Sequence, residues 1–167
     1  MKNTKTLFIG GVKSGKSANA EKFTLRLSKN KPIYLATTEF IDDEMQEKIN
    51  AHKKNRNDSF VTIEESLKLH EAITNINGVV LVECVSMWIN NMLYHDYNFE
   101  DITKEIKSIL AQDKTIVFVL NDVGNSILPE NKLAREFINI SGKIAQLIAS
   151  SCDGVYHNIA GISTKIK

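Results

Sequence analysis

The sequence feature that most constrains the fold is a glycine-rich stretch near the start of the chain. Residues 10–17 read Gly-Gly-Val-Lys-Ser-Gly-Lys-Ser, which matches the G-x-x-x-x-G-K-[ST] pattern of a phosphate-binding P-loop. The apolar run 6–9 precedes this stretch, and apolar residues at helical spacing follow it over residues 18–28. This order matters because the backbone N–H groups of the loop and the start of a helix present partial positive charge to an anion. The sequence therefore predicts a strand, a phosphate-binding loop and a helix.

Particular side chains in and near this loop have predicted chemical roles. Lys16 would reach the terminal phosphates of a nucleotide, and the hydroxyl of Ser17 would be a ligand of Mg²⁺. A buried strand beside the loop commonly delivers an acidic side chain to the same metal ion. Two expected strands end in such an acid, one in Glu83 and the other in Asp122. We predict Glu83 as the metal ligand, and Asp122 stays the alternative because periodicity does not distinguish between them.

Short apolar runs alternate with amphipathic helical patterns along the whole chain. Strands are expected at residues 6–9, 33–36, 60–63, 79–83, 116–120 and 155–159. Helices are expected at residues 18–28, 42–56, 87–93 and 99–112 and from residue 129 onwards. A further helix is expected to follow Ser66 as its cap and to reach residue 73. Residues 162–166 are expected to form a short tail. This alternation predicts one α/β domain over residues 1–167, with three layers and a mostly parallel central sheet. Ligands bind at the carboxyl edge of such a sheet, where residues 10–17, 37–39, 83 and 121–122 would meet.

One histidine has an informative position. A helix over residues 42–56 would place His52 on the same face as Met45 and Ile49, with basic residues following it directly. Histidine is a common general base and can act as a nucleophile. Its basic neighbours would attract phosphates and would lower the pKa of the imidazole, which favours the neutral form. The residues alone leave two interpretations open, a structural histidine or a catalytic one.

Charge and composition exclude several classes of function. The chain has 21 basic and 20 acidic residues and a net charge of +1, so no nucleic-acid or anionic-membrane partner is expected. The longest apolar runs are too short to span a bilayer, and no apolar region typical of a signal peptide follows the first lysines. The two cysteines, Cys84 and Cys152, have no Cys-x-x-Cys partner and are expected to be buried. We therefore expect a cytoplasmic protein.

Several short motifs, spread along the chain in a fixed order, resemble those of one known family. They are GGxxSGKS at 10–17, YxAT at 34–37, DxEM…I…H-[KR]-x-x-R at 42–56, LLEC at 81–84, N-[ED]-VG…PEN-x-LAR at 121–135 and SGI-x-x-KIK at 160–167. The set resembles the bifunctional adenosylcobinamide kinase/adenosylcobinamide-phosphate guanylyltransferase family of cobalamin synthesis. The resemblance covers essentially the whole chain.

The resemblance implies a RecA-like P-loop NTPase fold, a homotrimer and two successive reactions on a corrinoid substrate. In the first reaction, ATP or GTP would phosphorylate the aminopropanol hydroxyl of adenosylcobinamide. In the second, GTP would guanylylate a histidine with release of pyrophosphate, and GMP would then pass to adenosylcobinamide phosphate to give adenosylcobinamide-GDP. The histidine of the family's motif falls on His52.

The resemblance also implies a set of nucleotide contacts. Carried over position by position, they fall on Gly10, Gly11, Val12, Lys13, Ser14, Gly15, Lys16, Ser17, Thr37, Thr38, Glu39, Lys53, Lys54, Asn55, Arg56, Glu64 and Glu83. Two other functions use the same P-loop without His52. One is a kinase for a different small alcohol or nucleoside, and the other is a nucleotide-binding regulator that does not catalyse a reaction.

Overall fold

The computed structural model describes residues 3–39, 58–125 and 129–167 of the chain. The strands in these ranges are β1 (Lys5–Gly10), β2 (Ile33–Ala36), β3 (Val61–Glu64), β4 (Val80–Glu83), β5 (Ile116–Asn121), β6 (Gly154–Ile159) and β7 (Ile162–Lys165). The helices are α1 (Lys16–Leu27), α3 (Leu69–Thr74), α4 (Val85–Tyr94), α5 (Phe99–Ala111) and α6 (Lys132–Ser151). The expected helix over 42–56, which carries His52, lies outside the described residues.

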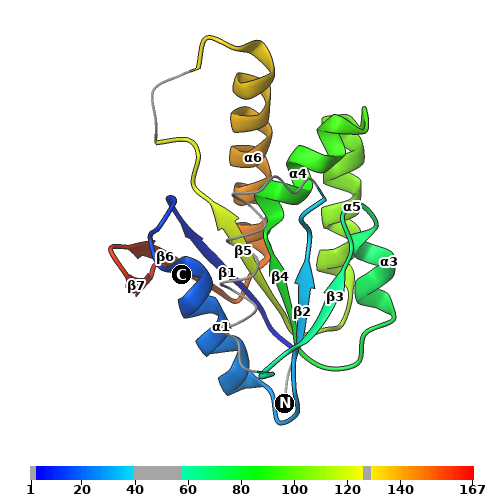
Figure 1. The fold of residues 1–167 in the computed structure, drawn as a ribbon, viewed down its shortest axis with the longest axis vertical. Coiled ribbons are helices and arrows are strands. Elements are labelled where there is room, and N and C mark those ends of the chain that lie inside the picture. Colours follow the sequence, from blue (N-terminus) through cyan, green and yellow to red (C-terminus); the bar gives the residue numbers. More distant parts are fainter. Residues whose placement is uncertain (1–2, 40–57, 126–128) are drawn as a thin grey trace.

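The strands form one seven-stranded sheet in the order β3-β2-β4-β5-β1-β6-β7. Every neighbouring pair is parallel except β6 and β7, which form an antiparallel hairpin at one edge. Helix α1 packs on one face of the sheet, while α3, α4, α5 and α6 cover the other (Figure 1). The predicted three-layer α/β fold with a mostly parallel sheet is therefore confirmed.

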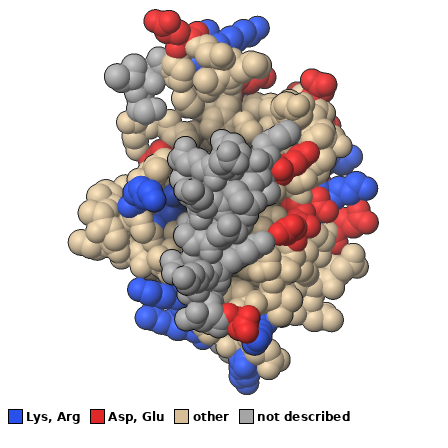
Figure 2. All heavy atoms as spheres, viewed as in Figure 1, with Lys and Arg blue, Asp and Glu red and all other residues tan. Residues whose placement is uncertain are grey.

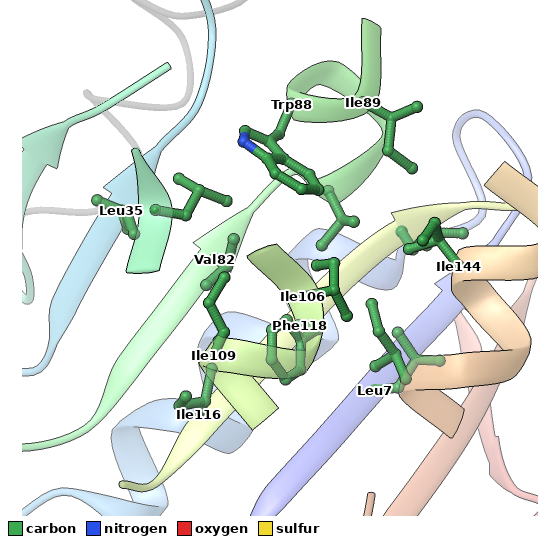
Figure 3. Close-up of a cluster of buried hydrophobic side chains, with 14 of the residues drawn as sticks. Leu7, Leu35, Val82, Trp88, Ile89, Ile106, Ile109, Ile116, Phe118 and Ile144 are labelled. Atoms are coloured by element: carbon green, nitrogen blue, oxygen red, sulfur yellow. The ribbon is translucent and has the colours of Figure 1, made fainter. Parts of the chain in front are cut away.

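The core explains why the strand sequences read as continuous apolar runs. Strands of a parallel sheet are covered on both faces, so successive side chains are all buried. In β5, all five residues from Ile116 to Leu120 are buried. The larger apolar cluster lies under α4, α5 and α6 and includes Trp88, Val82 and Phe118 (Figure 3). A smaller cluster that includes Phe8 and Ala20 lies under α1.

Two local predictions were incomplete or wrong. Ser66 does not cap α3. The helix begins at Leu69, and the Glu65 carboxylate accepts the N–H groups of Leu67 and Lys68, each at 2.8 Å. A carboxylate accepts both donors with the same oxygen, so it closes this turn in place of a hydroxyl cap. The expected tail at 162–166 forms strand β7, because the turn after β6 returns the chain along that strand.

None of the described helices is long and apolar enough to cross a membrane. The face of the molecule seen in Figure 2 carries both acidic and basic side chains, and several acidic ones gather on its right side. Both cysteines are buried free thiols, as predicted.

Candidate functional site

The glycine-rich loop joins the end of β1 to the start of α1 at the carboxyl edge of the sheet (Figure 1). Gly15 directly precedes α1 and has a φ of 88°, a conformation that side chains with a Cβ adopt rarely. Val12 and Lys13 are exposed, whereas Gly10, Ser14 and Lys16 are buried. The Lys16 ammonium donates a hydrogen bond to the carbonyl of Gly11 at 3.2 Å. An amine with three N–H donors is thus held inside the curve of the loop.

The first turn of α1 faces the end of β4. Strand β5 lies between β4 and β1 in the sheet, and Ser17 reaches across it to Glu83. The Ser17 hydroxyl donates to the Glu83 carboxylate at 2.8 Å. A hydroxyl oxygen and a carboxylate oxygen are the hard donors that Mg²⁺ prefers. These two oxygens fit a Mg²⁺ site in which the protein supplies one or two ligands and phosphates and water molecules supply the others.

Asp122, the alternative acid, is oriented differently. Its carboxylate accepts the backbone N–H of Gly124 at 3.2 Å and the side-chain N–H of Asn125 at 2.5 Å. Asp122 therefore shapes the turn after β5, and Glu83 is the acid that meets Ser17. Within the described parts of the chain, no group of three or more His, Cys, Asp or Glu side chains is placed to hold a metal ion.

Thr37 connects β2 to β4 beneath this edge. Its buried hydroxyl accepts the N–H of Cys84 at 2.9 Å and donates to the carbonyl of the same residue at 2.8 Å. Its backbone N–H donates to the carbonyl of Glu83 at 3.0 Å, which extends the pairing of the two strands. Burial, together with the charge of Glu83, raises the pKa of the Cys84 thiol to about 11. Cys84 is therefore a neutral thiol near pH 7. Direct contact of Thr37 with a nucleotide stays a prediction.

The remaining predicted contacts on this side follow strand ends that lie next to each other. Ala36 is paired with Glu83 on one side and with Glu64 on the other, so both acids lie along the same edge. Thr38 and Glu39 follow directly and are half-buried. Glu39 contacts His95, with 2.7 Å between Oε1 and Nε2. His95 belongs to none of the sequence motifs described above, and no local pattern links two residues this far apart in the chain.

Part of the predicted site lies outside the described residues. This part comprises His52, Lys53, Lys54, Asn55 and Arg56. Their roles stay predictions.

A hollow lies at the opposite, amino-terminal edge of the sheet. It has a volume of about 460 Å³ and is lined by residues 3–4, 27, 76–79 and 113–115. Its polar groups bind one another: Asn3 donates to Asp113, and Lys114 donates to the carbonyls of Thr74 and Ile76. The chemical groups that suit a nucleotide lie at the carboxyl edge, and we place the candidate site there.

The fold and this site together define a P-loop nucleotide-binding protein. Among solved structures, the chain is similar in fold to the KaiC-like protein PH0186 from Pyrococcus horikoshii OT3, with a TM-score of 0.54 and 12% identity over 92% of this chain and 70% of that one. It is also similar to the flagellar accessory protein FlaH from Methanocaldococcus jannaschii, with a TM-score of 0.50 and 15% identity over 97% and 75% of the two chains. At these identities, the similarity concerns the fold alone.

Comparison of sequences identifies the family. Residues 6–166 match the sequence model of CobU, described as cobinamide kinase / cobinamide phosphate guanyltransferase. Proteins named "bifunctional adenosylcobalamin biosynthesis protein CobU" from Escherichia coli and Salmonella typhimurium are 36% and 34% identical, each over 96% of this chain and 98% of the relative. The chain belongs to the cobinamide kinase / cobinamide phosphate guanyltransferase family, which confirms the resemblance found in its motifs.

Proposed function

We propose that this protein phosphorylates adenosylcobinamide with an NTP and then transfers GMP from GTP to the phosphorylated product. The observation that carries the proposal is the Ser17–Glu83 pair at 2.8 Å, set at the end of a P-loop that holds the buried Lys16. Membership of the family indicates that the substrate is a corrinoid, because two of the relatives are named for a bifunctional role in adenosylcobalamin biosynthesis. The product of the two steps would be adenosylcobinamide-GDP.

Different residues at this edge of the sheet would bind different parts of the nucleotide and its Mg²⁺. The backbone N–H groups of the loop and the start of α1 would bind the β- and γ-phosphates. The Lys16 ammonium, which donates to the Gly11 carbonyl in the structure, would donate to phosphate oxygens of the nucleotide. Ser17 and Glu83 would hold Mg²⁺, which neutralises charge on the phosphates when it is bound. The other contacts that we propose on this edge are Thr37, Thr38, Glu39 and Glu64.

Each reaction exchanges one P–O or P–N bond for another. In the kinase step, the aminopropanol oxygen forms a bond to the γ-phosphorus, the bond from that phosphorus to the β-phosphate oxygen breaks, and the hydroxyl proton passes to solvent. In the transfer step, a neutral imidazole nitrogen of His52 forms a bond to the α-phosphorus of GTP and pyrophosphate leaves. A phosphate oxygen of adenosylcobinamide phosphate then attacks the same phosphorus, which releases His52. Lys16 and the loop amides would stabilise the departing phosphates.

The experiment that tests the proposal follows both products. The pure protein is incubated with adenosylcobinamide, Mg²⁺ and GTP, and corrinoids are separated and identified by mass spectrometry. We expect adenosylcobinamide phosphate to form first and adenosylcobinamide-GDP to follow. Accumulation of the phosphate alone would contradict guanylyl transfer and favour a plain P-loop kinase. Binding of GTP with no corrinoid product would favour a nucleotide-binding regulator.

We expect the Glu83→Gln substitution to raise the Mg²⁺ concentration needed for half-maximal activity by about 10–100-fold. Glutamine keeps the size of the side chain and a hydrogen bond with Ser17, but it removes the negative charge that attracts the cation. The measurement is a Mg²⁺ titration of turnover at saturating GTP. Glu71→Gln is the matched control, because Glu71 is an exposed carboxylate on α3. An unchanged Mg²⁺ requirement in Glu83→Gln would assign the metal to another acid.

The homotrimer implied by the resemblance is also part of the proposal. Light scattering coupled to size-exclusion chromatography measures the molar mass directly. A mass of three chains supports the trimer, and a mass of one or two chains contradicts it.

A further inference from the structure

The turn between β6 and β7 contacts the P-loop directly, although more than 140 residues separate the two segments. The backbone N–H of Gly161 donates to the carbonyl of Ser14 at 2.8 Å. A Cβ added to Gly15 would lie 2.8 Å from the Cα of Gly161, so the two backbones touch. Gly161 itself has a φ of +83°, a conformation that favours glycine. The hairpin turn therefore lies against the loop with no room for a side chain at Gly15.

Asn19, in the first turn of α1, connects this hairpin to the helix. Its side-chain amide donates to the Asn158 side-chain oxygen at 3.0 Å and to the carbonyl of Gly161 at 3.1 Å. Both contacts require an N–H donor at position 19. A carboxylate of the same size would place an acceptor against two acceptors.

The orientation of Asn158 is set independently of Asn19. Asn158 is fully buried, and its amide donates to the carbonyls of Ile9 and Tyr156, each at 3.2 Å. Its side-chain oxygen must therefore point away from those carbonyls and towards Asn19. The end of β1 is equally close, since a Cβ on Gly10 would lie 2.4 Å from the carbonyl oxygen of Asn158. Residues 158–161 thus contact both ends of the P-loop as well as the helix that follows it.

We infer that residues 158–161 support the phosphate-binding shape of the P-loop, and that Asn19 is a positioning residue for nucleotide binding. The inference rests on the proposed function, in which the loop amides bind phosphates. Binding by several backbone N–H groups depends on their mutual geometry to within about 0.5 Å. The Gly161–Ser14 bond and the Asn19 bonds fix that geometry from the side of the hairpin. Asn19 acts through residues 158–161, because its amide is engaged with Asn158 and Gly161 and Gly161 in turn contacts Ser14 of the loop.

The test compares Asn19→Ala and Asn19→Asp with the wild-type protein. Asn30→Ala is the matched control, since Asn30 is exposed and lies beyond the far end of α1. The readouts are the Kd for a fluorescent GTP analogue in the presence of Mg²⁺, the KM for GTP, the melting temperature, and hydrogen exchange of the backbone amides. Alanine is the better helix former, so Asn19→Ala is expected to fold.

We expect Asn19→Ala to raise the Kd and KM about tenfold, because the two hydrogen bonds that join α1 to residues 158–161 are lost. Asn19→Asp is expected to raise both values further. Amide exchange is expected to accelerate in residues 13–17 and to stay unchanged in β5, with a melting temperature within about 3 °C of wild type. Unchanged Kd, KM and loop exchange in Asn19→Ala would overturn the inference, even if the melting temperature fell. If wild-type protein itself does not bind GTP, the proposed function fails, which is a different outcome.

Discussion

Replacing Lys16 with alanine is expected to lower nucleotide-dependent turnover at least about a hundredfold. Lys16 is a buried cation at the first position of α1, held towards the curve of the P-loop by its contact with Gly11. In the proposed function, this ammonium neutralises charge on the departing phosphates. A cation in a partly dehydrated site stabilises such charge more strongly than one in water. Both reactions should therefore fail in the same variant.

The measurement is steady-state formation of each corrinoid product at saturating GTP. Lys22→Ala is the matched control, because Lys22 lies on the same helix and is exposed. That variant is expected to retain wild-type turnover. A Lys16→Ala protein with normal melting temperature and normal turnover would refute the assignment of the P-loop as the phosphate-binding site.

The second large effect is expected from His52→Asn, which should abolish GMP transfer and leave the kinase step. Asparagine keeps a polar side chain of similar size but has no nitrogen that can attack phosphorus. The imidazole is the proposed nucleophile of the transfer step alone. We therefore expect His52→Asn to convert the added adenosylcobinamide to adenosylcobinamide phosphate, which accumulates.

Quantifying both corrinoids by mass spectrometry separates the possible outcomes. His70→Asn is the control, since His70 lies on α3 and its backbone N–H is bound by Glu105. That variant should form both products. Formation of adenosylcobinamide-GDP by His52→Asn at the wild-type rate would contradict the histidine mechanism. Loss of both products in a folded variant would contradict the separation of the two steps.

Local patterns were sufficient to predict most of the fold. The strands and helices around residues 6–36 and 79–120 follow from apolar runs and helical spacing, and the structure places them within a few residues of the prediction. The P-loop could also be predicted from the sequence, because its backbone conformation and its binding of phosphate require particular residue types. Its glycine before α1, Gly15, has the positive φ that such a turn requires.

Choices that depend on three-dimensional packing were not predictable in the same way. Glu83 is the last residue of one buried strand and Asp122 directly follows another, so the sequence could not select between them. In the structure, Ser17 donates a hydrogen bond to Glu83, while Asp122 accepts an N–H of the turn that follows it. That Glu83 is the metal ligand stays a prediction. Similarly, Glu65 rather than its neighbour Ser66 accepts the N–H groups that precede α3. Each outcome depends on the direction in which a side chain leaves the backbone.

Contacts between distant segments form a second class that sequence patterns did not reveal. His95 meets Glu39 across 56 positions, and Asn19 meets Gly161 across 142. Neither pair has a spacing that a helix or strand repeats, since both depend on the order of strands in the sheet. The support of the P-loop by the β6–β7 turn exists only because β6 lies directly beside β1.

Covalent labelling measures whether this P-loop protein carries GMP on His52. The pure protein is incubated with Mg²⁺ and GTP labelled at the α-phosphorus, then denatured and assayed for bound label, with His52→Asn beside it. We predict acid-labile, base-stable label on the wild-type protein and none on His52→Asn. No label on folded wild-type protein that binds GTP would contradict a GMP–histidine intermediate.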